Sequence, residues 1–213
     1  MNPLAARVLS TVAGQLGNPH GLLGKGTAVL LNRTNRFLIA EAVRAAGSEV
    51  GETVADIGFG GGVGISLLLE QVGPTGNVHG IEISPDMLTR ARSGFSTQIA
   101  AGRLKVDEGS LTALPLDDAS LDAAITVNTI YFVPDLDQVC AELARVLRPH
   151  GKAIIGIGDP ETMSRMPFTQ YGFHLRPLKE IIAALEASGL TVESRPTPHK
   201  PIPGHLLIAR PKT

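Results

Sequence analysis

The stretch VADIGFGGGVG, residues 54–64, places five glycines within seven positions, directly after a short apolar run that ends in an acid. Glycine loses more backbone freedom on folding than any other residue, so this composition suits a tight turn or a close ligand approach. Residues 53–57 have the pattern of a buried strand, and residues 63–71 that of a helix. Because the first N–H groups of a helix lack partners, a strand, glycine turn and helix in this order predict a cofactor site.

Predicted strands and helices alternate from this turn to the end of the chain. The strands are expected at residues 53–57, 78–83, 104–107, 121–128, 152–158, 190–194 and 205–210, and the helices at 63–71, 85–92, 136–147 and 177–188. This alternation predicts an α/β fold with a doubly wound, mostly parallel seven-stranded sheet. The last two strands have no helix between them, so they are expected to form a hairpin that adds one antiparallel strand.

Two helical patterns precede the first strand. Apolar residues recur every four positions from Leu4 to Leu16, which predicts a helix over residues 3–16, and a second helix is expected over residues 27–46. The first helix is expected to pack on the domain, although a lid over the site or a dimer surface stays open. We divide the chain into an N-terminal helical segment, residues 1–47, and a cofactor-binding domain, residues 48–213.

The composition narrows the classes of function. The 213 residues carry a formal net charge of −1 and only 4% aromatic residues, which argues against binding to nucleic acid or to an anionic membrane surface. We find no signal peptide and no apolar run near the ~18 residues of a membrane span, so we expect a cytoplasmic protein. Cys140 is the only cysteine, which excludes an intrachain disulfide, and its surroundings indicate a place in a helix core.

The spacing of the glycines separates two cofactor classes. The dinucleotide pattern G-x-G-x-x-G fails in three registers, because its last glycine would fall on Val63, Ile65 or Leu67. The pattern that fits is D-x-G-x-G-x-G, formed by Asp56, Gly58, Gly60 and Gly62. An acid at the end of the strand suits a ligand with a cationic end, or a turn that is held by hydrogen bonds to the carboxylate.

Four sequence blocks follow one another along the chain, and their order carries a family resemblance. They are VADIGFGGG (54–62), HGIEIS (79–84), LPLDDASLDAAI (114–125) and PDLDQVCAELARVLRPHGKAIIG (134–156). With them the sequence resembles the class I S-adenosylmethionine-dependent methyltransferases, in the broad group that includes the ubiquinone and menaquinone biosynthesis methyltransferases. The resemblance covers residues 50–159. It implies a Rossmann-like methyltransferase fold, S-adenosylmethionine as cofactor, and methyl transfer to a small-molecule acceptor.

The resemblance also implies roles for the matched residues. The turn formed by Gly58, Phe59, Gly60 and Gly62 would lie against the methionine end and the ribose, and Asp56 would order it. Glu82 would hold the ribose hydroxyls with both carboxylate oxygens. Ile83 and Met87 would pack on the adenine ring, although Met87 could equally fill the core.

Two further positions complete the predicted cofactor site. The family often has an acid facing the adenine amino group where this chain has Ser110, within Gly109, Ser110 and Leu111. Serine can accept the same hydrogen bond without charge, and Asp107 or Glu108 could substitute for the acid. Asn128, at the end of a strand, would face the methionine portion, or would simply cap the strand.

The predicted chemistry is an in-line displacement in which an acceptor atom attacks the methyl carbon of the sulfonium. Alignment supplies much of the rate, and an oxygen or carbon nucleophile also needs a base. Residues 159–176 form a long connection and are expected to be a substrate cap loop. The base candidates are His174, Tyr131, Asp159 and His20.

The histidines and the single cysteine show no metal-ligand spacing, so no metal site is predicted, although a magnesium ion held by carboxylates and substrate hydroxyls stays open. The lone cysteine argues against arsenite methylation. The alternative functions are a nucleotide-cofactor (NAD(P)) oxidoreductase and a catalytically silent S-adenosylmethionine-binding module. The expected partner is a small molecule, and the chain is expected to be a monomer or a homodimer.

Overall fold

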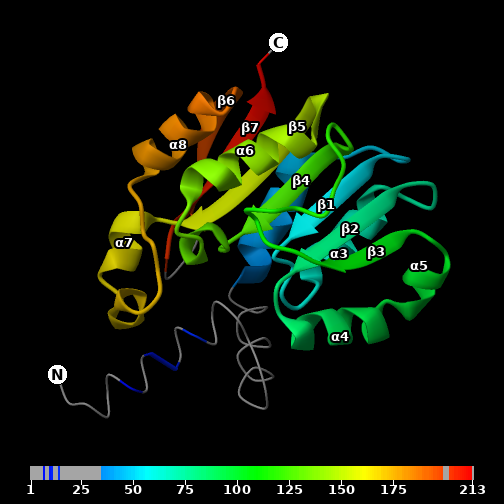
Figure 1. Cartoon of the computed structure of the whole chain (residues 1–213), viewed down its shortest axis with the longest axis horizontal. Coiled ribbons are helices and arrows are strands. Elements are labelled where there is room, and N and C mark those ends of the chain that lie inside the picture. Colours follow the sequence, from blue (N-terminus) through cyan, green and yellow to red (C-terminus); the bar gives the residue numbers. More distant parts are fainter. Residues whose placement is uncertain (1–6, 8–9, 12–13, 15–34, 199–201, 213) are drawn as a thin grey trace.

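The computed structural model describes residues 35–198 and 202–212, together with positions 7, 10, 11 and 14. These residues form one seven-stranded sheet with the order β3-β2-β1-β4-β5-β7-β6 (Figure 1). The strands are β1 (Thr53–Ile57), β2 (Asn77–Glu82), β3 (Leu104–Glu108), β4 (Leu121–Val127), β5 (Leu147–Gly158), β6 (Leu190–Thr197) and β7 (Gly204–Pro211). Strands β1 to β5 are parallel, and β7 is antiparallel to both β5 and β6. The predicted fold is therefore confirmed.

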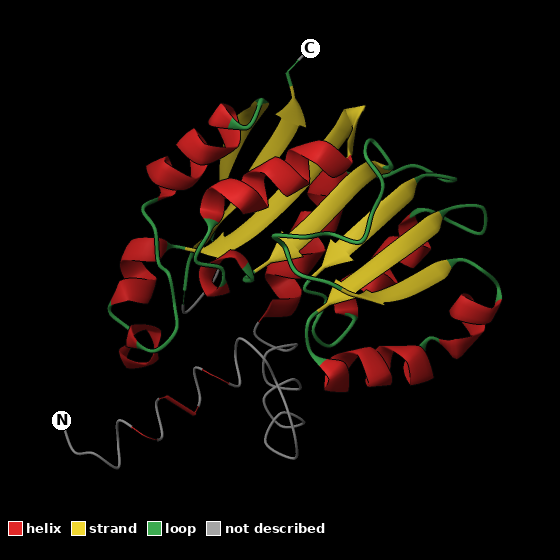
Figure 2. Ribbon diagram, in the orientation of Figure 1, coloured by secondary structure: helices red, strands yellow, loops and turns green. Residues whose placement is uncertain are grey.

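Helices cover both faces of the sheet (Figure 2). One face packs against residues 35–46, which are helical, and against α3 (Val63–Gln71) and α4 (Pro85–Gly94). The other face packs against α6 (Leu136–Val146) and α8 (Leu178–Ala187). Each face has its own buried apolar cluster, so the sheet is the middle of three layers.

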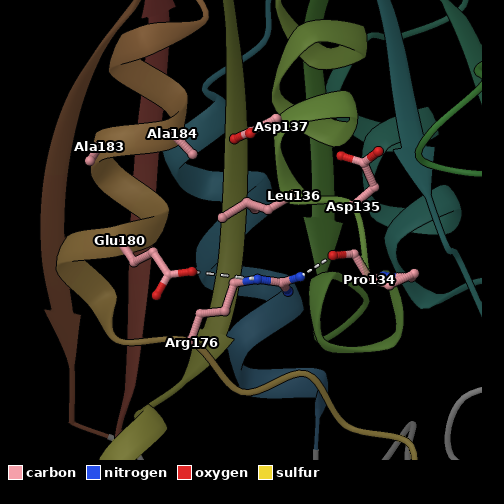
Figure 3. Close-up of a pocket in the computed structure, with 8 residues that line it drawn as sticks. All are labelled: Pro134, Asp135, Leu136, Asp137, Arg176, Glu180, Ala183 and Ala184. Atoms are coloured by element: carbon pink, nitrogen blue, oxygen red, sulfur yellow. Dashed lines mark hydrogen bonds and ion pairs between the residues drawn. The ribbon is translucent and has the colours of Figure 1, made fainter.

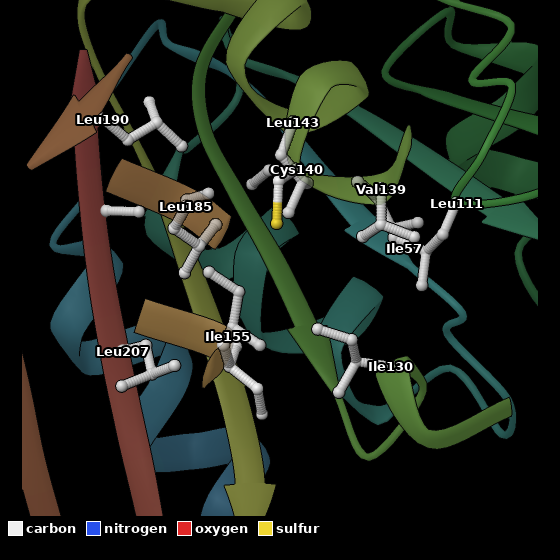
Figure 4. Close-up of a cluster of buried hydrophobic side chains, with 14 of the residues drawn as sticks. Ile57, Leu111, Ile130, Val139, Cys140, Leu143, Ile155, Leu185, Leu190 and Leu207 are labelled. Atoms are coloured by element: carbon white, nitrogen blue, oxygen red, sulfur yellow. The ribbon is translucent and has the colours of Figure 1, made fainter. Parts of the chain in front are cut away.

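Cys140 lies within the cluster between α6 and the sheet (Figure 4). It contacts a core made of aliphatic side chains that include Leu143, Ile155 and Leu185. Burial raises the pKa of its thiol to about 12, so the thiol stays protonated. The expected place in a helix core is confirmed.

Local sequence signals set most of the helix ends. Helix α4 begins at Ser84, whose hydroxyl accepts a hydrogen bond from the Met87 N–H at 3.4 Å, and Pro85 follows at the first helical position. Helix α6 begins at Asp135, whose carboxylate accepts from the Gln138 N–H at 3.0 Å. Strand β5 begins at Leu147, five residues before the predicted start, because the chain pairs again with β4 across a register shift.

Four short elements were not predicted. They are α5 (Ser96–Ala100), α7 (Pro160–Ser164) and the 3-10 turns η1 (Ile130–Phe132) and η2 (Pro167–Gln170). Each has five residues or fewer, which is too short for a hydrophobic period to appear. Residues 159–176, expected to be a loop, therefore contain α7 and η2; we call this segment the cap.

The N-terminal predictions are described only in part. Positions 7, 10, 11 and 14 of the predicted helix 3–16 are helical. The predicted helix 27–46 is described, and is helical, over residues 35–46. His20 lies outside the described residues.

The carboxyl ends of the central strands meet at one edge of the sheet, which we call the carboxyl edge. The chain passes from β1 outward through β2 to β3, and then crosses back to β4 and on to β5. The strand order reverses between β1 and β4. In open α/β sheets, ligands bind beyond the carboxyl ends of the strands at this point.

Candidate cofactor and acceptor site

The glycine turn lies at the carboxyl edge between β1 and α3. Gly58, Gly60 and Gly62 have φ values of +73°, +50° and +79°, which favour glycine. A side chain on Gly58 would collide with Thr129, and a Cβ on Gly62 would lie 2.9 Å from the ring of Phe95. At Gly60 a Cβ would meet nothing within 4 Å. Gly60 is thus the point of the turn at which the backbone faces open space.

Glu82, at the end of β2, holds this turn. One carboxylate oxygen accepts a hydrogen bond from the Gly60 N–H at 2.9 Å. The other accepts from the N–H groups of Ile83 and Ser84 at 2.8 and 3.1 Å. Glu82 is only 6% exposed, so its charge is stabilised by these three donors. The two oxygens offer about four lone-pair sites, so the oxygen that accepts from Gly60 keeps about one site for a further donor.

Asp56 occupies the buried side of the turn and is 5% exposed. It accepts a hydrogen bond from the backbone of Ile65 in α3, and a side chain on Gly64 would collide with its carboxylate. Burial raises the pKa of Asp56 to about 7, with the charge of Glu82 adding to the rise and the Ile65 hydrogen bond opposing it. The carboxyl group therefore ties β1 to the start of α3, and its contact with Gly64 was not predicted.

The apolar residues of the predicted cofactor site separate into two groups. Ile83 is 45% exposed beside Glu82, so its side chain is available to a ligand. Met87 and Phe59 are 1% and 4% exposed and lie in the cluster beneath α3 and α4. This placement agrees with the core alternative for Met87, and the ring of Phe59 lies in the same core cluster.

Gly109, Ser110 and Leu111 follow β3 at the same edge. The Gly109 N–H donates to the carbonyl of Glu82 at 3.2 Å, which brings this segment beside the end of β2. The Ser110 hydroxyl lies 3.0 Å from that of Thr112 and accepts from the Thr112 N–H at 3.3 Å. Leu111 is 6% exposed and belongs to the core.

An ion pair that the sequence did not predict holds the connection from β3 to β4. The Arg145 guanidinium donates to both oxygens of Glu142, at 2.7 and 2.8 Å, and to the carbonyls of Leu116 and Leu114, at 2.7 and 3.2 Å. The Leu114 N–H donates to Glu142 at 2.7 Å. Hydrogen bonds from Arg145 are the main cause that lowers the pKa of Glu142. The pair therefore anchors residues 114–116 on α6.

Asn128 directly follows β4 and has φ +58°, a left-handed conformation. Its side-chain oxygen lies 3.3 Å from the Gly158 N–H, and its amide nitrogen donates to the side chain of Asn35 at 3.1 Å. Asn35 was not predicted as a site residue. A polar residue within a predicted helix carries no signal that it will contact a strand end 93 positions later.

The base candidates that are described lie at the carboxyl edge, but with different exposure. Tyr131 is 2% exposed, and burial raises the pKa of its phenol, so it is not suited to remove a proton. Asp159 caps α7, and hydrogen bonds from Thr162 lower its pKa. Its carboxylate also lies 3.4 Å from the His205 ring. His174 is exposed, and its backbone N–H donates to the carbonyl of Tyr131 at 2.7 Å.

Aromatic rings connect the cap to η1. The ring of Phe173 lies 4.7 Å from that of Phe132, 5.7 Å from Phe168 and 6.0 Å from Tyr131, between centroids. Phe132, Phe168 and Phe173 are half-buried. These rings place an apolar surface beside the ends of β4 and β5.

A groove of about 650 Å³ lies between the start of α6 and α8 (Figure 3). Arg176 crosses its floor and donates to the carbonyls of Pro134 and Val133, at 2.6 and 3.1 Å, with Glu180 at 3.8 Å. None of the predicted cofactor residues lines this groove. Arg176 ties the end of the cap to the segment that follows η1.

Two observations concern the described part of the chain as a whole. No group of three or more His, Cys, Asp or Glu side chains within it is placed to hold a metal ion. No helix in these residues combines the length and apolar character that would let it span a bilayer.

Comparison with known proteins agrees with the geometry of the glycine turn. The model of a methyltransferase domain family matches residues 55–155. A 2-phytyl-1,4-naphtoquinone methyltransferase of Trichormus variabilis is 32% identical over 131 residues, which are 61% of this chain and 57% of that protein. An arsenite methyltransferase of Halobacterium salinarum is 33% identical over 105 residues, 49% of this chain and 27% of that protein.

Solved structures agree on the fold. A SAM-dependent methyltransferase from Aquifex aeolicus superposes with a TM-score of 0.70 and 20% identity, covering 86% of this chain and 97% of that one. The chain matches between 21% and 57% of the length of its curated relatives. The resemblance drawn from four sequence blocks is confirmed, and S-adenosylmethionine is the methyl donor of this class. Residues 55–155 are a methyltransferase domain of the class I S-adenosylmethionine-dependent family.

Proposed function

We propose that this chain transfers the methyl group of S-adenosylmethionine to a small, partly apolar acceptor. The observation that carries the proposal is the pairing of Glu82 with Gly60. A buried carboxylate holds a glycine whose backbone faces open space, at the point where the strand order reverses. This arrangement suits a ligand with hydroxyl donors that lies against bare backbone.

The proposed cofactor pose follows from the exposed groups. A ribose hydroxyl donates to the free lone-pair site of Glu82, and the adenine packs on the exposed side chain of Ile83. The adenine amino group faces Ser110, with Asp107 and Glu108 nearby in the sequence. The methionine portion points along the turn toward Asn128. The relatives' class and the four sequence blocks support this pose.

The proposed acceptor site is the aromatic surface between η1 and the cap. Phe132, Phe168 and Phe173 offer half-buried ring faces, which suit a planar or apolar molecule. The name of the relative from Trichormus variabilis states an acceptor of that kind. Arsenite is the less suitable acceptor, although one relative carries that activity in its name, because the single thiol of this chain is buried in the core.

The proposed reaction is a displacement at carbon. The acceptor atom, oxygen or carbon, forms a bond to the methyl group, and the electrons of the carbon–sulfur bond go to sulfur. The products are the methylated acceptor, S-adenosylhomocysteine and a proton. His174 and Asp159 stay the base candidates among the described residues, since Tyr131 is buried and keeps its proton.

We also propose a compartment and an oligomeric state for the enzyme. We place it in the cytoplasm, as a monomer or homodimer, because a single buried cysteine suits a reducing compartment. The cap, residues 159–176, is proposed to close over the acceptor.

Thermal unfolding with ligands tests the proposal. S-adenosylmethionine and S-adenosylhomocysteine at about 100 times their dissociation constants should stabilise the chain by about 2.7 kcal/mol, which raises Tm by roughly 5–10 °C. NAD(H) and NADP(H), the matched controls, should leave Tm unchanged. A rise with the nicotinamide ligands alone would support the oxidoreductase alternative. Binding of the adenosyl ligands without turnover across an acceptor panel would support the silent module.

A further inference from the structure

Tyr131 is an almost fully buried polar side chain at the carboxyl edge beside β4 and β5. It lies in η1, is 2% exposed, and its hydroxyl reaches groups from two strand ends. The hydroxyl lies 3.3 Å from the side-chain oxygen of Asn128 and 3.2 Å from the carbonyl of Gly158. It also accepts a hydrogen bond from the Gly158 N–H. The phenol therefore joins the end of β4 to the end of β5.

Asn128 has its conformation fixed by these contacts. Its φ of +58° is strained for a residue other than glycine, and such strain persists only where the surroundings determine the conformation. The backbone N–H of Asn128 donates to Gly156 at 2.8 Å. Its side-chain oxygen faces Tyr131 and Gly158, so its amide nitrogen is turned away from them, toward Asn35.

The opposite side of Tyr131 contacts the cap. Its ring lies 6.0 Å from the ring of Phe173, and its carbonyl accepts from the His174 N–H at 2.7 Å. Arg176 then fixes the end of the cap to the residues that follow η1, through the carbonyls of Val133 and Pro134. A single residue therefore contacts both the cap and the side chain of Asn128.

We propose that Tyr131 is a positioning residue that couples the acceptor cap to the cofactor site through the side chain of Asn128. The inference rests on the proposed function, in which Asn128 faces the methionine portion of the cofactor. The hydroxyl orients the Asn128 carboxamide, while the ring and the carbonyl keep contact with Phe173 and His174. A cap that settles on an acceptor holds Tyr131 in place, and Tyr131 in turn holds the group that contacts the cofactor.

A double-mutant cycle in the full chain tests this coupling, with S-adenosylhomocysteine binding by calorimetry as the readout. Tyr131→Phe keeps the ring and removes the hydroxyl. Asn128→Gly removes the carboxamide and suits the positive φ. Each change should weaken binding about threefold to tenfold, the factor carried by one hydrogen bond. In the Asn128→Gly background, Tyr131→Phe should have no further effect, because the group that it positions is absent.

The control is Tyr171→Phe, which removes the hydroxyl of the only other tyrosine in the sequence. Tyr171 lies in the cap, and the change should alter binding less than twofold. If the factors by which Tyr131→Phe and Asn128→Gly weaken binding multiply in the double variant, the two changes act independently and the inference is overturned. Unchanged binding in Tyr131→Phe would overturn it as well. Absence of binding by the wild-type chain would instead overturn the proposed function, and with it the basis of the coupling.

A second cycle keeps the inference testable if Tyr131→Phe does not fold. Phe173→Leu leaves every hydrogen bond of Tyr131 in place and removes the ring contacts of Phe173 with Tyr131, Phe132 and Phe168. It should weaken S-adenosylhomocysteine binding about twofold to threefold in the wild-type background and not in the Asn128→Gly background. An equal effect in both backgrounds, or no effect in the wild type, contradicts the coupling.

Discussion

The two halves of the carboxyl edge are built in different ways. Beside β1 and β2, the site consists of backbone groups in left-handed conformations, held by the buried carboxyl group of Asp56 and the buried carboxylate of Glu82. Beside β4 and β5, it consists of side chains, namely the rings of η1 and the cap and the amide of Asn128. The first half suits a fixed ligand, and the second suits one that varies between relatives.

The difference explains what a sequence can reveal about each half. A backbone that must adopt positive φ needs glycine at given spacings, so the pattern D-x-G-x-G-x-G is visible in the chain itself. An aromatic surface can be assembled from rings at many positions. Phe132 and Phe173 lie 41 positions apart in the sequence, and no local sequence pattern predicts that the centroids of their rings lie 4.7 Å apart.

The largest effect on ligand binding is expected at Gly60, in the half beside β1 and β2, where the backbone faces open space. Gly60→Val should weaken S-adenosylhomocysteine binding more than about 100-fold, because the new side chain fills the space that a ligand needs and is strained at φ +50°. Gly189→Val is the matched control, since Gly189 also has positive φ (+87°) with nothing within 4 Å, but lies after α8. Calorimetric titration of both variants should find a loss for Gly60→Val alone. Equal affinities would break the assignment of this half to the cofactor.

The next effect concerns pH and the buried carboxyl group of Asp56. Its pKa is raised to about 7 by burial, so the folded protein keeps a proton that the unfolded chain releases above about pH 4. The contribution of Asp56 to the free energy of unfolding therefore falls as pH rises from about 4 to about 7, and is constant above that.

Asp56→Asn has no such group to titrate. Urea denaturation of both proteins from pH 4 to pH 8 should show the stability of the wild type falling relative to the variant up to about pH 7. Parallel curves would mean that Asp56 is charged in the folded state, and that this half is held by two anions.

A smaller effect is expected for the ion pair that anchors the connection after β3. Glu142→Gln should lower the free energy of unfolding by about 1–2 kcal/mol, because it removes the less exposed of the two carboxylates that pair with Arg145 and leaves only Asp118, which is 79% exposed. Glu161→Gln is the control, since the Glu161–Arg165 pair is 82% and 75% exposed and should contribute less than about 0.5 kcal/mol. Urea denaturation measures both. Similar losses would show that burial does not distinguish the two pairs.

The smallest effect concerns the end of the cap. Arg176→Met removes three hydrogen bonds to backbone carbonyls, so the cap should open more often and chymotrypsin should cleave near Phe168 about tenfold faster. Arg165→Met removes a solvent-exposed arginine from the same segment and should change the rate less than twofold. If both variants are cleaved at the same rate, Arg176 does not hold the cap in the half of the site beside β4 and β5.

Most of the fold could be read from the sequence, because its strands and longer helices carry clear periods and end signals. Helix α3 and strand β1 occupy the predicted residues, Val63–Gln71 and Thr53–Ile57. The cap could not be read in the same way, since α7 and η2 span one turn each and are held by tertiary contacts such as the ring of Phe173.

The same distinction between local sequence signals and tertiary contacts applies to the residues of the candidate site. Glu82 and the glycines were predicted, since strand ends and turns have local signatures. Met87 shows what the sequence cannot predict, because a methionine on the first turn of a helix can point into the core or toward a ligand. Tyr131 shows another limit, since its raised pKa arises from burial among residues that are distant in sequence.

The antiparallel β7 has a consequence for how the chain is made. Strand β5 is paired with β4 on one side and with β7 on the other, and β6 reaches the sheet only through β7. Synthesis proceeds from the N-terminus, so one side of β5 stays an unpaired edge until residues 204–211 have emerged from the ribosome. The half beside β4 and β5, where we propose the acceptor site, is therefore completed last, after the proposed cofactor half already has all of its strands.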